Sequence, residues 1–329
     1  AASLAGAGAA AARLAPALRG QEAKSKVVEV VSPGVLASGE PDAERVRQMI
    51  ARGITALTGE DDPAAAWRSF VGPDDVVGIK INCLGGPGII TSHAVTDAII
   101  EGCRSAGVPT KSIIVWDRFQ MHLLKSGYEV VEEGDGVRCY GTEGGGSIGY
   151  DDEVFWECDP PDKKGNRRSR LTKILTRQIT KMINVPVLKD HAEAGVTFCL
   201  KNVAYGVADN TARTHEAPWH CDPFTAEICA MPAVRDKWVL NIGDALRGVY
   251  EGGPTYSPAF AFEHNTILLS LDPVAMDQIA LETIVAKRQE NGRPPLEAVG
   301  RPPKHIATAA RKGLGTNDPR RIERVKLSV

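Results

Sequence analysis

Asp75-Val-Val-Gly-Ile-Lys-Ile-Asn82 is the stretch that decides the fold, because such an apolar run predicts a strand buried on both faces. The loop Gly85-Gly-Pro-Gly88 follows, and Ser92 is a suitable N-cap for a helix over residues 93–106. Ser112-Ile-Ile-Val-Trp-Asp117 is a second apolar run of the same kind. Strand, glycine loop, helix and strand compose a βαβ unit, in which the two strands are parallel.

The alternation of strands and helices continues on both sides of this unit. Further strands are predicted over residues 26–32, 182–187, 237–242, 266–271 and, at an edge, 325–329. Further helices are predicted over residues 41–57, 171–181, 224–231, 273–287 and 305–312. This pattern is typical of an α/β fold in which a mostly parallel sheet carries helices on both faces.

The chain is long enough for two lobes around a cleft. We predict a first α/β lobe over residues 26–180 and a second over residues 181–329. The pattern weakens over residues 137–170, where we expect a long excursion such as a hairpin or a lid.

Composition argues against several classes of protein. The 329 residues carry a formal net charge of -2, so nucleic acid is not an expected partner and a small ligand is. The seven cysteines form no CxxC pair, which predicts mostly buried free thiols and no iron–sulfur cassette in this chain. The alternative is one disulfide among Cys139, Cys158, Cys221 and Cys229. No window of about eighteen uninterrupted apolar residues follows position 25.

The first 20 residues are mostly Ala, Gly and Leu, and a polar segment follows them. This weakly apolar stretch resembles the middle and end of a twin-arginine export signal, whose two arginines would precede the first residue. The alternative is an Ala-rich helix that docks onto a partner. We therefore expect residues 1–25 to be a signal-like or docking segment, and the protein to be exported, either periplasmic or membrane-associated.

Polar side chains recur where the predicted strands end. Lys80 and Asn82 close the first strand of the βαβ unit, Asp117 closes the second, and Asp244 follows a later strand. Because the carboxyl ends of parallel strands share one edge, where open α/β sheets bind ligands, we predict one shared cleft. The alternative is that each residue caps the next helix, which a lysine cannot do because it has no acceptor.

Pro186-Val-Leu-Lys-Asp-His191, followed by Lys201 and Asn202, concentrates charge in an apolar part of the chain. Buried lysines and histidines are uncommon without a partner or a task. His191 has the intrinsic pKa of a general acid or base. Lys189 and Lys201 can bind a carboxylate or form a covalent link to a cofactor, and with His191 they are the predicted catalytic residues.

A ligand or cofactor is expected to contact several neighbouring segments. Asn82 and Asn202 would orient it, and Asp244 would fix a histidine tautomer. The glycine loop offers backbone N–H groups to a phosphate or carboxylate, or is a simple tight turn, and its spacing matches neither dinucleotide-binding nor P-loop patterns. The predicted cofactor-binding residues are Lys80, Asn82, Gly86, Gly88, Asn202 and Asp244.

The segment from Asp209 to Asp222 contains three candidate metal ligands, His215, His220 and Cys221. Imidazole and thiolate suit transition metals such as nickel, zinc or copper. The alternative is structural, with both histidines hydrogen-bonded within a loop.

Several motifs resemble the family known as DUF362, over about residues 76–284. They are VVGIKINCLGGPG from Val76, INVPVLKDHAEAGVTFCLKNVAYGV from Ile183, THEAPWH from Thr214, LNIGDALRGVYEGGP from Leu240 and LLSLDPVAMDQIALETI from Leu268. The resemblance implies an α/β fold without a defined biochemical role. Many relatives append a four-cysteine iron–sulfur cassette, which this chain lacks.

A more distant likeness is to the lactate racemase family, which uses a nickel-pincer nucleotide. In that family a histidine shuttles protons, a lysine ten residues later tethers the cofactor, and a later histidine binds nickel. His191, Lys201 and either His215 or His220 stand in a similar order here. The likeness implies a nickel-pincer-like nucleotide as one candidate cofactor.

Three hypotheses about function follow. The first is an exported racemase, epimerase or oxidoreductase that acts on a small carboxylate with a metal or nucleotide-derived cofactor. The second is a non-catalytic subunit of a larger assembly, for example in electron transfer, or of a homo-oligomer, docked through its N-terminal segment. The third is a metal-binding protein that uses His215, His220 and Cys221.

Overall fold

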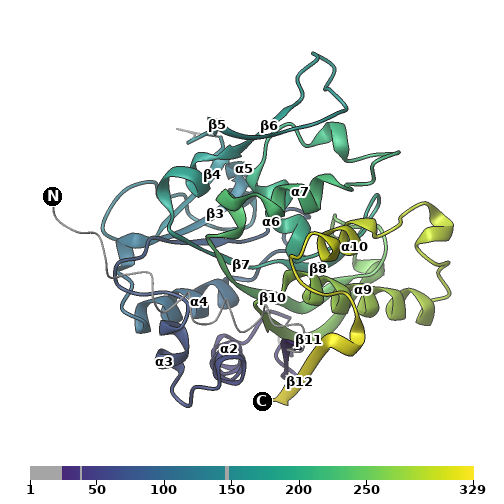
Figure 1. The fold of residues 1–329 in the computed structure, drawn as a ribbon. Helices are drawn as coiled ribbons and strands as arrows, with labels where there is room; N and C mark the ends of the chain where they lie inside the picture. Colours follow the sequence, from purple (N-terminus) through teal and green to yellow (C-terminus); the bar gives the residue numbers. More distant parts are fainter. Residues whose placement is uncertain (1–23, 38, 145–147) are drawn as a thin grey trace.

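The computed structural model describes residues 24–37, 39–144 and 148–329 and has an α/β fold (Figure 1). A 10-stranded sheet has the order β12-β1-β11-β10-β7-β2-β3-β4, with β8 paired to β10 and β9 paired to β8. The pairs β1 with β11, β10 with β11 and β8 with β9 are antiparallel, and the others are parallel. The predicted fold class is confirmed.

The strands of this sheet are β1 (Ser25–Val31), β2 (Val77–Lys80), β3 (Ile113–Phe119), β4 (Arg138–Glu143), β7 (Lys181–Asn184), β8 (Val187–His191), β9 (Gly195–Thr197), β10 (Trp238–Val249), β11 (Ala261–Ser270) and β12 (Ile322–Ser328). A separate hairpin is made of β5 (Tyr150–Glu157) and β6 (Arg168–Thr172). The helices are α2 (Ala43–Thr58), α3 (Pro63–Arg68), α4 (His93–Ser105), α5 (Gln120–Lys125), α6 (Cys199–Val207), α7 (Phe224–Ala230), α8 (Pro232–Arg235), α9 (Pro273–Glu290) and α10 (Lys304–Arg311).

The predicted βαβ unit is β2, α4 and β3. Residues 77–80 pair in parallel with residues 113–116. Ser92 caps α4 by accepting a hydrogen bond from the Val95 N–H. This connection sets the carboxyl ends of β2 and β3 side by side.

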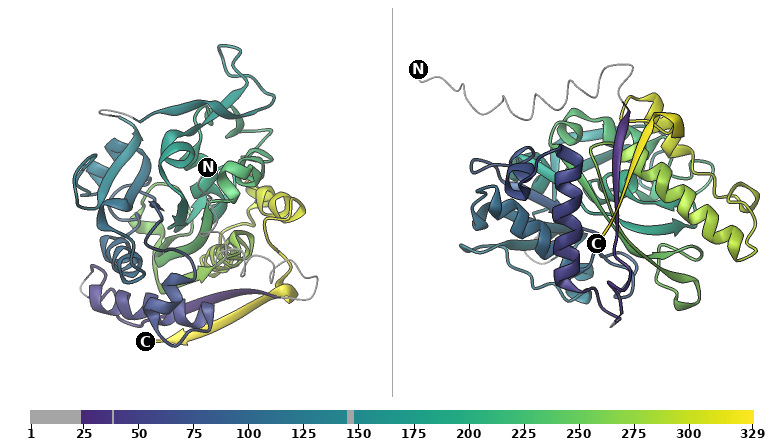
Figure 2. Two further views of the ribbon diagram at one scale, coloured as in Figure 1. Left: turned by 60° about the vertical axis from the view of Figure 1, so that its left-hand side comes forward. Right: turned by 90° about the horizontal axis from the view of Figure 1, so that it is seen from below.

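Helices cover both faces of the sheet and define two apolar cores. One core contains residues of α2, α3 and α4, and the other contains residues of α6, α7, α9 and α10. Strand β3 contributes to both because its side chains alternate: Ile113 and Val115 face the first core, while Ile114 and Trp116 face the second. In the right-hand view of Figure 2, α2 and α9 lie on opposite sides of β1 and β12.

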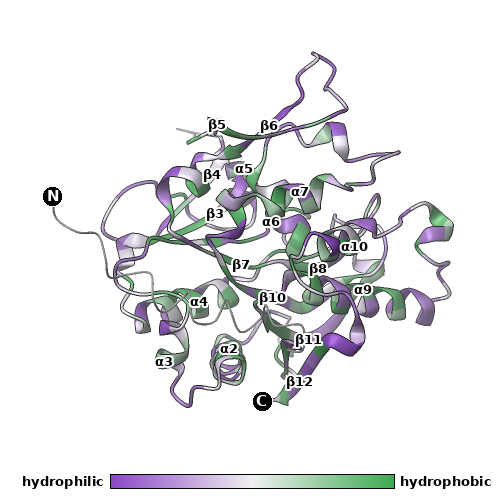
Figure 3. Ribbon diagram, viewed as in Figure 1, coloured by the Kyte–Doolittle hydropathy of each residue, from purple (hydrophilic) through white to green (hydrophobic). Residues whose placement is uncertain are grey.

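The segment from residue 137 to residue 187 departs most from the sequence prediction. The expected excursion contains the β5–β6 hairpin, whose projecting part is mainly hydrophilic (Figure 3), but it also contains β4, a strand of the main sheet. The helix predicted over residues 171–181 is wrong, because that segment holds the end of β6, a π-helical turn at Ile174–Gln178 and the start of β7. The strand predicted over residues 182–187 is split by Pro186, which has no N–H for a ladder.

The boundary predicted between residues 180 and 181 falls inside the main sheet. Strand β7, from the predicted second lobe, lies between β2 and β10, and β1, from the first, lies between β11 and β12. The two predicted lobes therefore share one sheet.

The predicted signal-like or docking segment falls almost entirely on residues 1–23, outside the described residues. Within the described part of the chain, no helix is long and apolar enough to cross a membrane. The seven cysteines are all free thiols, as expected.

Candidate functional site

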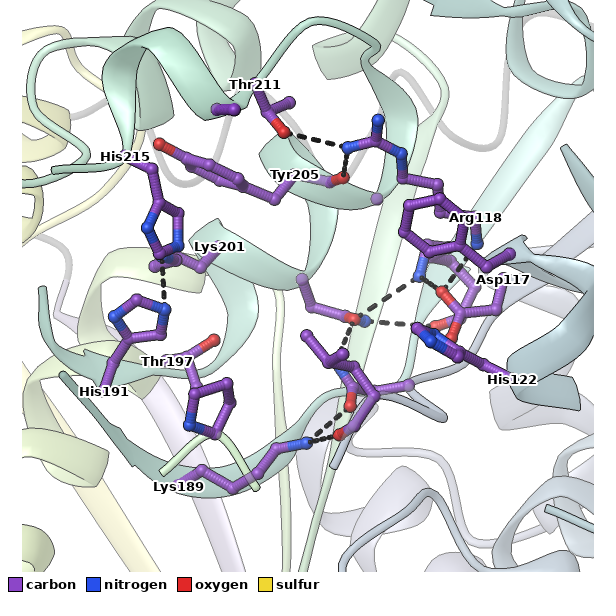
Figure 4. A pocket seen from close by; sticks show the side chains of 18 of the residues that line it. Asp117, Arg118, His122, Lys189, His191, Thr197, Lys201, Tyr205, Thr211 and His215 are labelled. Atoms are coloured by element: carbon purple, nitrogen blue, oxygen red, sulfur yellow. Dashed lines mark hydrogen bonds and ion pairs between the residues drawn. The ribbon is translucent and has the colours of Figure 1, made fainter. Parts of the chain in front are cut away.

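A cavity of about 480 Å³ opens at the carboxyl ends of β2, β3 and β8 (Figure 4). Its volume suits a small-molecule ligand. In Figure 4, His191, Lys201 and His215 lie on one side of it, and Asp117, Arg118 and His122 on the other. The sequence-predicted residues that line it are Lys80, Asn82, Lys189, His191, Lys201, Asn202 and His215.

Lys80, the last residue of β2, binds Asp117 of the neighbouring strand. Its Nζ donates to Asp117 Oδ1 at 2.7 Å, to the Ile81 carbonyl at 2.6 Å and to Asn202 Oδ1 at 3.4 Å. Burial raises the pKa of the Asp117 carboxyl, but Lys80 and backbone N–H groups outweigh burial and hold this pKa below its usual value. The pair is therefore charged, and three protein oxygens surround the Lys80 ammonium.

Lys189 holds the glycine loop against β8. Its Nζ donates to Asn82 Oδ1 at 2.6 Å, to the Leu84 carbonyl, and to the Ile89 carbonyl at 3.3 Å. Burial lowers the pKa of Lys189 to about 7, yet three oxygen acceptors fit the ammonium, because an uncharged amine has only two N–H groups. The structure therefore places Lys189 as a support for the loop, with all three donors already occupied.

Lys201 and His191 meet at the opposite end of the cavity. Lys201 Nζ lies 3.0 Å from His191 Nε2 and 3.0 Å from Cys221 Sγ. His191 Nδ1 accepts the backbone N–H groups of Glu193 and Ala194, each at 3.1 Å. A neutral imidazole has one N–H, so the proton of His191 is on Nε2, and Lys201 accepts it as an uncharged amine. Burial also lowers the pKa of Lys201, which favours the uncharged amine.

His191, His215 and Cys221 form a buried group of potential metal ligands. Their ligand atoms all lie within 4.8 Å of one another. Burial lowers the pKa of His215 to about 4 and the pKa of His191 well below its usual value, so both imidazoles are uncharged at neutral pH. Uncharged imidazole is the form that binds metal ions.

His220, one of the metal ligands predicted from the sequence, lies outside this group. Its Nδ1 is 3.0 Å from Glu193 Oε2. The loop turns at His220 and Cys221, which both have positive φ, and this turn carries the imidazole of His220 away from the thiol of Cys221. His191, at the end of β8, takes the place of His220 in the group.

Asp244 and the glycine loop lie at a second cavity of about 330 Å³, lined in part by Gly88 and Asp244. Asp244 accepts the N–H groups of Ser92 at 2.8 Å and Leu246 at 3.2 Å. The expectation that Asp244 fixes a histidine tautomer is therefore wrong, because its carboxylate is directed at the start of α4. Gly86 lines neither of the two cavities.

Sequence reasoning missed Tyr205, Arg118 and Asp277. The Tyr205 ring lies 4.3 Å from Lys201 Nζ, and its spacing of four residues from Lys201 on α6 is a signal that could have revealed it. Arg118 lines the cavity and follows Asp117 at the end of β3. Asp277, in α9, accepts the N–H groups that begin α6, a contact that no local pattern predicts.

Comparison with known proteins identifies a family but no activity. Residues 77–282 match the family described as "Domain of unknown function (DUF362)". No curated protein matches the chain. A crystal structure of a protein from Thermotoga maritima has 9% sequence identity and a TM-score of 0.40, and the match covers 77% of this chain and 60% of that protein.

The family match begins at the first residue of β2 and ends within α9, so it includes the strands and the helix that carry Lys80, His191 and Lys201. It covers more than half of the described fold. The chain belongs to the DUF362 family, a family of domains of unknown function.

Proposed function

We propose that the large cavity is the active site of a metal-dependent enzyme that acts on a small carboxylate. The observation that carries this proposal is the buried group of His191, His215 and Cys221, whose ligand atoms lie within 4.8 Å of one another. Imidazole and thiolate ligands favour a transition metal such as nickel or zinc. Three protein ligands leave a coordination position for a substrate, as in catalytic metal sites.

Metal binding at this group displaces protons. A thiol binds as thiolate, and His191 must release its Nε2 proton if that nitrogen binds the metal. Lys201 Nζ, 3.0 Å from both His191 and Cys221, is the nearest base for these protons. The two backbone N–H groups on His191 Nδ1 stabilise the electron-rich ring that results.

The charge of the cavity supports an anionic substrate. Lys189 is a buried ammonium, and no carboxylate of the described residues lies within ion-pair distance of it, whereas Lys80 is paired with Asp117. Buried positive charge without a counter-ion attracts a carboxylate. Lys201, 3.0 Å from two of the ligands, would carry the proton beside the metal, which suits proton transfer next to a carbonyl, as in a racemase or an epimerase. An oxidoreductase would also need the nucleotide-derived cofactor as hydride acceptor.

A nickel-pincer-like nucleotide, implied by the distant likeness to lactate racemases, is an alternative occupant of the same cavity. Lys201 would be the site of its covalent attachment. The convergence of Lys201, His191 and Cys221 favours an enzyme over a purely structural subunit, in which these groups would be spread among separate ion pairs. Export is also part of this proposal, and cell fractionation tests it. Assembly with a larger complex or a second copy is a further part, which size-exclusion chromatography of the native protein tests.

The test is elemental analysis together with an intact-mass spectrum of the natively purified protein. We expect one nickel or zinc ion per chain, and less than about a tenth of that content in His215→Gln and Cys221→Ser. The controls are His220→Gln and Cys158→Ser, which change the same residue types outside the group and should retain the metal. Unmodified mass without stoichiometric metal in the wild type would refute the proposal, and an adduct lost in Lys201→Met would favour the nucleotide cofactor.

A further inference from the structure

Four asparagines form one hydrogen-bonded chain that starts at the cavity and ends inside the sheet. Each amide accepts at its oxygen from the preceding member and donates from its nitrogen to the next. The chain runs from the Lys189 ammonium through Asn82, Asn202, Asn184 and Asn241 to the carbonyl of Ser270. It therefore has a single direction.

The bonds of this chain are short and its inner members are buried. Asn82 Nδ2 donates to Asn202 Oδ1 at 3.0 Å, and Asn202 Nδ2 donates to Asn184 Oδ1 at 2.8 Å. Asn184 Nδ2 donates to Asn241 Oδ1 at 2.9 Å. Asn184 is 0% exposed and Asn241 1%, so a reversed or broken bond would leave polar atoms unpaired in the core.

Groups that cannot change their role hold both ends. The Lys189 ammonium only donates, and it does so to Asn82 Oδ1. At the other end, Trp238 Nε1 donates to Asn241 Oδ1 at 2.9 Å, and the Ser270 carbonyl accepts from Asn241 Nδ2 at 3.2 Å. If any one amide were turned around, its N–H groups would face the preceding donor and its oxygen would face the next acceptor. The two ends therefore fix the orientation of every amide in the chain.

The orientation decides what Asn82 offers to a ligand. Its oxygen is taken by Lys189, and one N–H is taken by Asn202. Asn82 lines the cavity, and its second Nδ2 hydrogen has no partner among the described residues. The ammonium at the head of the chain also polarises the Asn82 amide and strengthens it as a donor.

We infer that Asn82 is a specificity-determining residue, held by the asparagine chain as a hydrogen-bond donor that selects an anionic oxygen of the ligand. This inference rests on the proposed function, because it concerns the substrate of the same site. A carboxylate oxygen fits the donor and the buried positive charge together. A group that presents N–H at this point meets a donor instead.

The test compares carboxylates with their neutral amides. Calorimetric titrations would use lactate with lactamide and glycolate with glycolamide, on the wild type, Asn82→Asp, Asn184→Asp and Asn291→Asp. The wild type should bind each carboxylate at least about tenfold more tightly than its amide, and Asn82→Asp should lose about 100-fold in carboxylate affinity. Asn82→Asp replaces the donor by an acceptor of the same shape and adds a negative charge beside Lys189.

Asn184→Asp and Asn291→Asp test whether the loss of carboxylate affinity is specific to position 82 or follows from any Asn-to-Asp change. Burial keeps the carboxyl of Asn184→Asp protonated, so it can still accept from Asn202 and donate to Asn241, and the preference for carboxylates should survive. Asn291→Asp makes the same substitution at the exposed end of α9 and should also keep the preference.

Two results would overturn the inference: unchanged carboxylate affinity in Asn82→Asp, or a wild type that binds no carboxylate of the panel more tightly than its amide. Metal content, measured on the same samples, separates this outcome from failure of the proposed function. Metal without carboxylate preference would refute only the role of Asn82, whereas carboxylate preference without metal would refute only the metal centre.

Discussion

Cys221 illustrates how a single residue departs from ordinary backbone geometry at the site. Its φ is 68°, in the left-handed region, and the preceding residue, His220, has a φ of 48°. Such a conformation costs a non-glycine residue about 1–2 kcal/mol. Neither residue of this strained turn is a glycine. The turn places the Cys221 thiol 3.0 Å from Lys201 Nζ.

We predict that Cys221→Gly separates stability from metal binding. Glycine removes the backbone strain as well as the thiol, so the free energy of unfolding should change by less than about 1 kcal/mol. The thiolate-to-metal absorption band of the cobalt-loaded protein should disappear. Chemical denaturation and visible absorption measure the two effects.

Cys229→Gly is the matched control, because Cys229 is equally buried but lies within α7. It should lose about 2 kcal/mol or more of stability through the cavity and the flexible helix backbone, and keep the band. A Cys221→Gly protein that is as unstable as Cys229→Gly, or that keeps the band, would contradict the assignment of Cys221.

The three lysines of the cavity acquire different states from their partners. Lys80 and Lys189 each donate to three oxygens, which suits an ammonium, whereas Lys201 faces the N–H of His191 and a thiol. The sequence indicated that these lysines have a task. Only their hydrogen-bond partners separate the two supports, Lys80 and Lys189, from Lys201 at the reactive end.

At the scale of elements, α6 depends on a carboxyl group that is distant in the sequence. Its N-cap residue, Phe198, supplies no side-chain cap. Asp277 of α9 replaces it, accepting the Cys199 N–H at 2.6 Å and the Leu200 N–H at 3.2 Å. Since α6 carries Lys201 and Asn202, the contact between α6 and α9 positions one wall of the cavity.

Asp277→Asn should destabilise the protein and alter its pH dependence. The amide leaves one helix N–H without an acceptor, at a cost of about 1–3 kcal/mol. In the wild type, burial raises the pKa of the Asp277 carboxyl to about 8, against the effect of its N–H donors. A carboxyl with a raised pKa stabilises the fold fully below its unfolded value of about 4, and this stabilisation is lost as the pH rises toward 8.

Urea denaturation between pH 4 and pH 8.5 checks this prediction. The wild type should lose more stability over this interval than Asp277→Asn, because the variant has no carboxyl at this position. Glu290→Gln, at the exposed C-terminal end of α9, is the control and should follow the wild type. Parallel curves for Asp277→Asn and the wild type would show that Asp277 does not titrate in this way.

At the scale of the whole molecule, one sheet joins the two halves of the chain. Strand β1 lies between β11 and β12, with Val27 opposite both Ser270 and Arg324, and β7 lies between β2 and β10. Each half therefore needs strands from the other half to complete its part of the sheet. We predict that residues 24–180 and residues 181–329, produced separately, do not fold.

Circular dichroism and amide proton dispersion in NMR spectra measure this outcome. Each half should lack a cooperative unfolding transition, and mixing the halves during refolding should restore one. The intact chain under the same conditions is the control. A cooperative transition in either isolated half would support the two-lobe division predicted from the sequence.

The sequence by itself determined the α/β class, most of the elements and the charged and amide residues at the centre of the cavity. Periodicity and caps are local signals, so Ser92 and the runs at residues 75–82 and 112–117 predicted β2, α4 and β3. Lys80, His191 and Lys201 were found because charged residues in apolar surroundings need a partner or a task. The helix over residues 171–181 failed because strand pairing takes both of its ends, in β6 and β7, and leaves only a π-helical turn between them.

Tertiary structure alone decided how these residues are combined. It joined His191 to His215 and Cys221, removed His220, directed Asp244 to α4 and brought Asp277 to the start of α6. These contacts link positions far apart in the chain, and no local pattern encodes which backbone turns bring them together. Tertiary structure also decided the direction of the asparagine chain, because this direction depends on donors and acceptors from separate strands.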